Sequence, residues 1–486
     1  MLLTPKEINF TEISKVKSLS PRNFAKIDIE NSNKVPLSGF LDEDNPYDQG
    51  EEPGSFTYVP KSNVSFIRNS CIDSSNFSNQ VIKEIFLNPK YEFDNSLFNE
   101  DVLLCKDANI GDSCLFLKEN RKDYVLSSGV VRLNFRRPSF KYYCLAFLRD
   151  EYFLKQLDAK TPKGSTIRHA GSKFLDCFIP DIGEKEENLL PLMEALLKNI
   201  SYSERVSYQR LCEANKAIEL DFFQVDETYA SPSVNSLVEH LRLDAGYYSK
   251  TVNNVQHSLE HYKNGVWSLH EAGFSMKRGT NLQKRDLGRS IQSDTFRKNY
   301  HLLVYPSDIS DNGYILKETY LGARNSVSYM KSGDILFSAE GTVGKVFIIC
   351  DESLKFVTNI HGLVISPDKK TNLNDSIILG QYLHYLRSIG YFDKVSVGGQ
   401  GGSYAVNYWE NFIFPKFGDD VKKRVAKLYH SGAILNPTQF SVEELGKAGV
   451  FELNKFRIEC NEILKRILED IKNNKAKDPA FYFNLD

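Results

Sequence analysis

The sequence predicts an α+β protein with two tandem β-rich domains, each followed by a long helix. Three observations support this fold class. The chain of 486 residues is too long for one hydrophobic core and fits two to four domains. Residues 102–116 repeat without a gap at 335–349, which indicates a duplication. Two stretches, 184–220 and the tail beyond residue 441, place apolar residues at the three- and four-residue steps of a helix.

The repeat aligns "VLLCKDANIGDSCLF" with "ILFSAEGTVGKVFII", so that Gly111 falls on Gly344 at an offset of 344 − 111 = 233. The same offset places Gly129 on Gly362. Both copies have two runs of β-forming residues around a turn glycine, which a tight hairpin with a positive φ requires. A phosphate-binding loop is disfavoured, because the segment 341–345 is two residues too short and Val346 replaces the required Ser or Thr. The sequence predicts a β-hairpin in each half.

The first two segments are a β-rich domain and a helical spacer. Short β-forming runs between Pro, Gly, Asn and Asp turn signals predict the first domain over residues 1–183, with a helix at 142–157. Residues 184–236 hold a helix with one apolar side over 184–220, followed by a linker. Pro191 is tolerated there because it lies near the start of the helix.

The second half repeats this order. Residues 237–417 predict a second β-rich domain with a helix at 374–390, and its ending "NFIFPKF" matches "DCFIPDI" in the first half. Residues 418–486 form the C-terminal spacer region, where Ser441 and Glu444 make a capping box ahead of a long helix. That helix carries a narrow apolar seam typical of a coiled coil.

Composition excludes several functional classes. With 41% hydrophobic residues, a mean hydropathy of −0.38 and no apolar run near 18 residues, no membrane span is predicted. The N-terminus lacks the features of a secretion signal, so a cytoplasmic location is expected. The eight cysteines contain no C-x-x-C pair, which disfavours a zinc site or a disulfide framework and predicts reduced core residues. No metal and no cofactor is expected.

The global charge does not indicate a nucleic-acid binder, but local basic stretches exist. The net charge is −2, whereas residues 276–300 carry seven Lys and Arg against two Asp. A solvated charged face explains such a stretch equally well.

Several segments, in order along the chain, resemble the specificity (S) subunit of type I restriction-modification systems. These are "LLCKDANIG", "TPKGSTIRHAGSKFLDCFIPDI", "RLDAGYY" (242–248), "GDILFSAEGTVGK" and "VGGQGGSYAVNYWENFIFPKF" (397–417). The resemblance implies that each β-rich domain is a target-recognition domain that reads one part of a split DNA sequence. It also implies that the two long helices pair as an antiparallel coiled coil that spaces the two readers. The expected partners are double-stranded DNA, DNA methyltransferase (modification) subunits and, where the system restricts DNA, restriction subunits.

The resemblance directs attention to two glycine-bearing loops and one basic stretch as the DNA-binding candidates. Glycines would let the backbone approach the duplex, Lys and Arg would contact phosphates, and bidentate side chains would select bases. The candidates are Lys163, Ser165, Arg168 and His169 in the first loop, Gln400, Gly401, Gly402, Ser403 and Tyr404 in the second, and Lys277, Arg278, Lys284 and Arg285 in the basic stretch.

Enzymatic alternatives lack their residues. An adenine methyltransferase needs an N/D-P-P-Y/F motif, and the chain offers a single-proline version, Asn45-Pro46-Tyr47, which reads as a turn. A nuclease needs paired carboxylates and a lysine on one strand, and the sequence does not offer this combination. His169 and His361 are interpreted as structural histidines. We therefore expect no catalytic activity. A specificity factor of another phage-defence or DNA-modification system, and a duplicated protein-interaction scaffold without DNA binding, stay open as alternatives.

Overall fold

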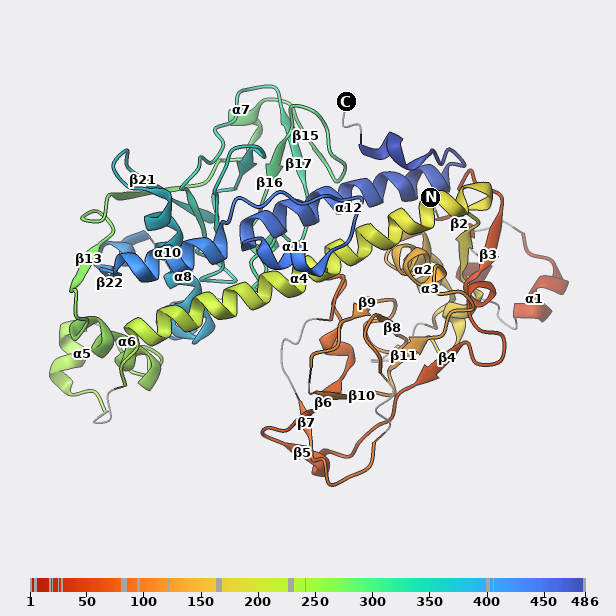
Figure 1. Ribbon diagram of the computed structural model, residues 1–486, viewed down its shortest axis with the longest axis horizontal. Coiled ribbons are helices and arrows are strands. Elements are labelled where there is room, and N and C mark those ends of the chain that lie inside the picture. Colours follow the sequence, from red (N-terminus) through yellow and green to blue (C-terminus); the bar gives the residue numbers. More distant parts are fainter. Residues whose placement is uncertain are drawn as a thin grey trace. The chain divides into compact units, whose positions relative to one another are not determined.

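The computed structural model describes the chain except residues 1, 4–6, 17–18, 20, 25, 28, 80–84, 94–96, 121, 163–167, 226–230, 241, 399–402, 405 and 484–486. The chain divides into two compact units. Unit 1 comprises Met1–Tyr202, Asn436–Ser441 and Glu459–Asp486, and unit 2 comprises Ser203–Leu435 and Val442–Ile458. Figure 1 shows the elements of both units coloured along the sequence.

Besides a short antiparallel pair of β1 (Leu2–Leu3) and β2 (Lys26–Ile27), unit 1 contains two four-stranded sheets and a two-stranded sheet that pairs distant strands. The first sheet has the order β4 (Tyr47–Gln49), β11 (Val130–Leu133), β8 (Asp101–Cys105) and β9 (Ser113–Phe116). The second has the order β10 (Asp123–Leu126), β6 (Val64–Ile67), β7 (Phe86–Leu87) and β5 (Tyr58–Val59), with β10 parallel to β6. The two-stranded sheet joins β12 (Phe178–Pro180) to β3 (Lys34–Pro36).

Unit 2 repeats these three sheets strand for strand. Its first sheet has the order β14 (Phe274–Arg278), β21 (Gly362–Pro367), β18 (Ile335–Ser338) and β19 (Val346–Ile348). Its second has the order β20 (Phe356–Val357), β16 (His301–Leu303), β17 (Tyr320–Ala323) and β15 (Ser290–Ser293), with β20 parallel to β16. The third joins β22 (Ile413–Pro415) to β13 (Val266–Ser268). The duplication therefore covers a complete sheet topology, far beyond the repeat visible in the sequence.

The predicted hairpin forms in both units. In unit 2, β18 pairs antiparallel with β19 through a turn in which Gly341 and Gly344 have φ values of 74° and 90°. In unit 1, β8 pairs with β9, and the equivalent residues Ala108 and Gly111 have φ values of 58° and 95°. Because a strand rather than a helix follows Lys345, the turn does not have the architecture of a phosphate-binding loop.

The helices of the two units also correspond, with one correction. Unit 2 has α8 (Leu373–Ser388) and α9 (Tyr391–Val395), which confirms the helix predicted at 374–390. The single helix predicted at 142–157 is wrong, because unit 1 has α2 (Phe140–Leu148) and α3 (Glu151–Lys160). Asp150 accepts a hydrogen bond from the backbone N–H of Tyr152 at 2.8 Å, and this cap starts the second helix.

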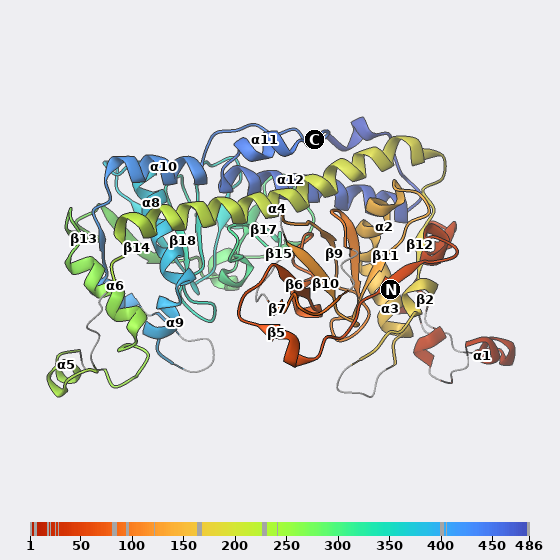
Figure 2. The same ribbon diagram turned by 60° about the horizontal axis from the view of Figure 1, so that its bottom comes forward.

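Two long helices carry the predicted spacer segments. They are α4 (Glu186–Phe222), with Pro191 in its second turn, and α12 (Val450–Lys472), and Figures 1 and 2 both show them side by side. Within unit 2, Arg457 on α12 donates to Glu204 on α4, and Arg210, further along α4, donates to the carbonyl oxygen of Gly446, which precedes α12. The partner numbers decrease as the numbers along α4 increase, so the two segments run antiparallel. This antiparallel pairing and the two β-rich regions confirm the predicted α+β fold.

Short elements complete the described chain. They are β1 (Leu2–Leu3), α1 (Phe10–Val16), β2 (Lys26–Ile27), α5 (Val234–His240), α6 (Lys250–Glu260), α7 (Lys284–Leu287), α10 (Asp419–Tyr429) and α11 (Val442–Lys447). None of the eight cysteines, all of which lie among the described residues, forms a disulfide. Seven are buried as predicted, whereas Cys212 on α4 is exposed because it lies on the outward side of that helix, which corrects the prediction for that residue.

A tight backbone approach recurs beside the hairpins and yields a stability prediction. A Cβ on Gly279 would lie 2.1 Å from the carbonyl oxygen of Asn359, and a Cβ on Gly50 would lie 2.1 Å from that of Leu126. Backbone atoms cannot swing aside, so Gly279→Ala is expected to lower the free energy of unfolding by about 1–3 kcal/mol in urea denaturation. Gly446→Ala is the matched control, because the described residues place no heavy atom within 4 Å of its Cβ. Equal effects of the two substitutions would contradict the prediction.

Candidate nucleic-acid interface

In unit 1, three loops meet at the hairpin turn. The backbone N–H of Lys106 donates to the carbonyl of Gly129 at 2.9 Å, which joins the turn to the loop before β11. The N–H of Ala108 donates to the carbonyl of Arg168 at 3.0 Å, and the N–H of Ala170 donates back to Lys106 at 2.8 Å. These bonds attach the turn to the glycine-bearing segment before β12.

Unit 2 assembles the same three loops. The N–H of Tyr404 donates to the carbonyl of Ala339 at 2.9 Å, and Glu340 forms an antiparallel bridge with Ser403. The N–H of Gly279 donates to the carbonyl of Gly362 at 2.9 Å, which adds the end of β14 to the group. We call these surfaces the converging loops: residues 106–111, 127–129 and 168–170 in unit 1, and residues 278–280, 339–344, 358–362 and 403–404 in unit 2.

A carboxylate occupies the same position in both hairpin turns, because 340 − 107 = 233. Asp107 Oδ1 lies 2.8 Å from His169 Nδ1, and its Oδ2 lies 3.5 Å from Lys106 Nζ. Glu340 Oε2 lies 2.6 Å from His361 Nδ1. The hydrogen bond from His361 is the main cause that lowers the pKa of Glu340 below its usual value.

Arg278 is the second basic partner of Glu340. Its Nη1 donates to Glu340 Oε1 at 3.3 Å and to the carbonyl of Ile360 at 3.0 Å, so the guanidinium links the end of β14 to two other loops. Its side chain is 49% exposed. It therefore stays accessible while its direction is fixed.

The converging loops contain five of the predicted DNA-binding residues. Arg168 forms an ion pair with Asp158 at 2.9 Å, and the side chain of His169 is 64% exposed. The side chain of Tyr404 is buried against Phe337 and Trp409 rather than exposed. The members of the predicted set that the structure places here are Arg168, His169, Arg278, Ser403 and Tyr404.

The other candidates lie elsewhere. Lys277 is exposed on β14, and Lys284 and Arg285 are exposed on α7, where Arg285 Nε lies 3.5 Å from Asp286. Among the hydrogen bonds and ion pairs of the described residues, none joins α7 to the converging loops, so a phosphate role for Lys284 and Arg285 stays a prediction. Five candidates lie outside the described residues: Lys163, Ser165, Gln400, Gly401 and Gly402.

Sequence reasoning missed the two carboxylates and gave His361 a structural role. The signal was present in the alignment, since Asp107 falls on Glu340 within the repeat. The histidine partners gave no such signal, because His169 follows its carboxylate by 62 residues and His361 follows by 21. Their pairing depends on the folded sheet.

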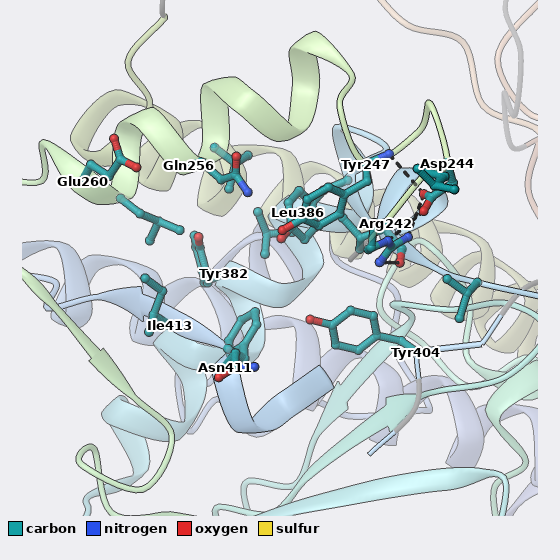
Figure 3. Close-up of a pocket in the computed structure, with 17 residues that line it drawn as sticks. Arg242, Asp244, Tyr247, Gln256, Glu260, Tyr382, Leu386, Tyr404, Asn411 and Ile413 are labelled. Atoms are coloured by element: carbon teal, nitrogen blue, oxygen red, sulfur yellow. Dashed lines mark hydrogen bonds and ion pairs between the residues drawn. The ribbon is translucent and has the colours of Figure 1, made fainter. Parts of the chain in front are cut away.

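A cavity of about 1020 Å³ in unit 2 has Val397 and Tyr404 among its lining residues (Figure 3). The segment "RLDAGYY" forms one wall, where Arg242 stacks on the ring of Tyr247 at 4.6 Å and donates to both oxygens of Asp244 at 2.8 and 2.7 Å. Tyr382 and Tyr404 line the cavity, and the buried hydroxyl of Tyr382 has no hydrogen-bond partner among the described residues.

Two features are absent from the described part of the chain. Among those residues, no group of three or more His, Cys, Asp and Glu side chains could hold a metal ion. None of the helices found there is both long and apolar enough to cross a membrane.

Comparison with known proteins found similarity at the level of structure. No family model and no curated protein matches the sequence. The S subunit of a type I restriction-modification system from M. genitalium is 13% identical, with 93% of this chain and 98% of that chain covered at a TM-score of 0.37. The HsdS subunit from Thermoanaerobacter tengcongensis is 14% identical, with 91% and 97% covered at a TM-score of 0.28. Over most of its length, the chain is similar at low identity to solved S subunits of type I restriction-modification systems.

Proposed function

We propose that this chain is a non-catalytic DNA-specificity subunit that reads a bipartite target and directs modification subunits to it. The observation that carries the proposal is the duplication of two four-stranded sheets and one two-stranded sheet, with the same converging loops at the hairpin turn of each unit. Two copies of one loop-bearing scaffold in a single chain fit a ligand with two separated recognition elements. Linking two weak readers also raises avidity through effective concentration.

The long helices supply a physical basis for separated half-sites. Helix α4 has 37 residues, which corresponds to about 55 Å at 1.5 Å per residue. One turn of DNA spans about 34 Å. The spacer between half-sites would then follow helix length, and the partners would be modification subunits and, in a restricting system, restriction subunits, acting in the cytoplasm.

The test is a selection from random-sequence duplexes, with the chain alone and with the methyltransferase partner that the proposal implies, over a salt series. Recovery of two conserved half-sites at a fixed spacing is the expected result. Loss of all sequence enrichment, with the methyltransferase present, would overturn the proposal. An absence of salt-sensitive DNA binding, together with no enrichment of any DNA sequence, would favour a protein-interaction scaffold.

The basic residues of α7 give a separate prediction under the same proposal. Exchanging Lys284 and Arg285 for glutamine is expected to weaken binding to all sequences alike and to reduce the slope of log K against log salt by about 1–2, since each phosphate contact contributes about 0.9. Filter binding at several salt concentrations measures the slope. Lys447→Gln is the matched control, because Lys447 pairs with Glu443 and Glu444 on α11. An unchanged slope of log K against log salt in the double variant would show that α7 does not contact the DNA phosphates.

A further inference from the structure

The repeated turn carboxylates have both oxygens occupied by basic groups. Asp107 meets His169 through Oδ1 and Lys106 through Oδ2. Glu340 meets His361 through Oε2 and Arg278 through Oε1. A carboxylate that is engaged on both oxygens is poorly available to accept a hydrogen bond from a cytosine amino group. The carboxylates themselves are therefore unsuited to contact bases.

The two histidines and Arg278 are more exposed than the carboxylates that they contact, whereas the side chain of Lys106 is only 14% exposed. The side chain of Asp107 is 18% exposed and that of its partner His169 is 64% exposed. The side chain of Glu340 is 36% exposed, against 56% for His361 and 49% for Arg278. In both units, the more exposed groups are hydrogen-bond donors, and each contacts a less exposed carboxylate.

We infer that Asp107 and Glu340 are positioning residues that aim His169 in unit 1, and Arg278 and His361 in unit 2, at the base edges of the half-site that each unit reads. The inference rests on the proposed function and names the specificity-determining residues of its site. Imidazole and guanidinium groups donate to guanine O6 and N7 in the major groove.

Base contact fits these groups better than phosphate contact. A basic side chain paired with a carboxylate carries little net charge, so its attraction to phosphate is weak, whereas its donors keep a fixed direction. Direction is what reading a base edge requires. The carboxylate position is constant, but the donors come from different loops, namely 168–170 in unit 1, and 278–280 and 358–362 in unit 2. The two units would accordingly read different half-sites.

The experiment applies the random-duplex selection to the full chain with its methyltransferase partner, comparing wild type, Glu340→Gln and Asp107→Asn. Glu340→Gln is expected to reduce the preference at one or more positions of the unit 2 half-site about tenfold, within the range of a bidentate contact, and to leave the other half-site unchanged. Asp107→Asn is expected to do the reverse. Glu352→Gln, which alters an exposed carboxylate paired with Lys331 in unit 2, is the matched control and should change neither half-site.

Two further readouts separate positioning from a merely structural role. His361→Gln is expected to change a subset of the base positions that Glu340→Gln changes, and the double variant to change no more than Glu340→Gln alone, because Glu340 acts through His361 as well as Arg278. A uniform loss of affinity without altered preference, or equal changes at both half-sites, would overturn the inference. If wild type yields no split motif, the proposed function fails. If wild type yields one and Glu340→Gln retains it, the positioning role alone fails.

Discussion

Replacing Arg457 with methionine is expected to destabilise unit 2 by about 3–5 kcal/mol, because two buried carboxylates would lose their counter-ion. Arg457 on α12 is buried and donates to Glu204 Oε1 at 3.0 Å and to Glu318 Oε1 at 3.1 Å. Its Nη1 also donates to the carbonyl of Ile315 at 2.9 Å. Glu204 and Glu318 are 0% and 4% exposed, so water cannot replace the guanidinium.

Tryptophan fluorescence during urea denaturation measures this effect selectively, because both tryptophans, Trp267 and Trp409, lie in unit 2. Lys447→Met is the control, because it breaks solvent-exposed pairs with Glu443 and Glu444 and should change stability by less than about 1 kcal/mol. If the Arg457 variant loses no more free energy of unfolding than the control variant, the prediction is wrong.

The sequence predicted the local elements and missed contacts that only the folded chain creates. The hairpin turns followed from apolar runs around a glycine, and α4 followed from its apolar spacing. The break between α2 and α3 was missed because the apolar pattern continues through Asp150, although aspartate is a preferred N-cap. The Arg457–Glu204 pair joins residues 253 positions apart, and neither its charge nor its spacing marks it as buried.

The candidate interface was likewise predicted only in part from the sequence. The glycine-bearing loops were found from sequence, and His169 and Arg278 lie where those loops converge. Tyr404 was expected to contact DNA, and its hydroxyl-bearing ring is instead buried among aromatic residues from three other segments. Sequence alone did not reveal that packing, because the residues that surround Tyr404 come from β18, α9 and the segment before β22.

Phe337→Ala is expected to remove about 3–5 kcal/mol from unit 2 and to abolish reading of its half-site. Phe337 on β18 is fully buried, and its ring centroid lies 4.8 Å from that of Trp409, 5.2 Å from Phe392 and 6.4 Å from Tyr404. The ring thus joins the strand that leads into Glu340 to the segment that carries Ser403. Phe337→Leu, which refills most of the volume, is expected to lose less than about 1.5 kcal/mol and to retain the half-site.

The duplication supplies an internal control for this prediction. Leu104 in unit 1 is fully buried and equivalent to Phe337, since 337 − 104 = 233. Leu104→Ala should cost about 2–5 kcal/mol without shifting the tryptophan-reported transition, and should impair the unit 1 half-site. Phe337→Ala should shift that transition and impair the unit 2 half-site. Loss of both half-sites in either variant would show that the units depend on each other for reading, whereas separate losses would make each scaffold the independent support of its own converging loops.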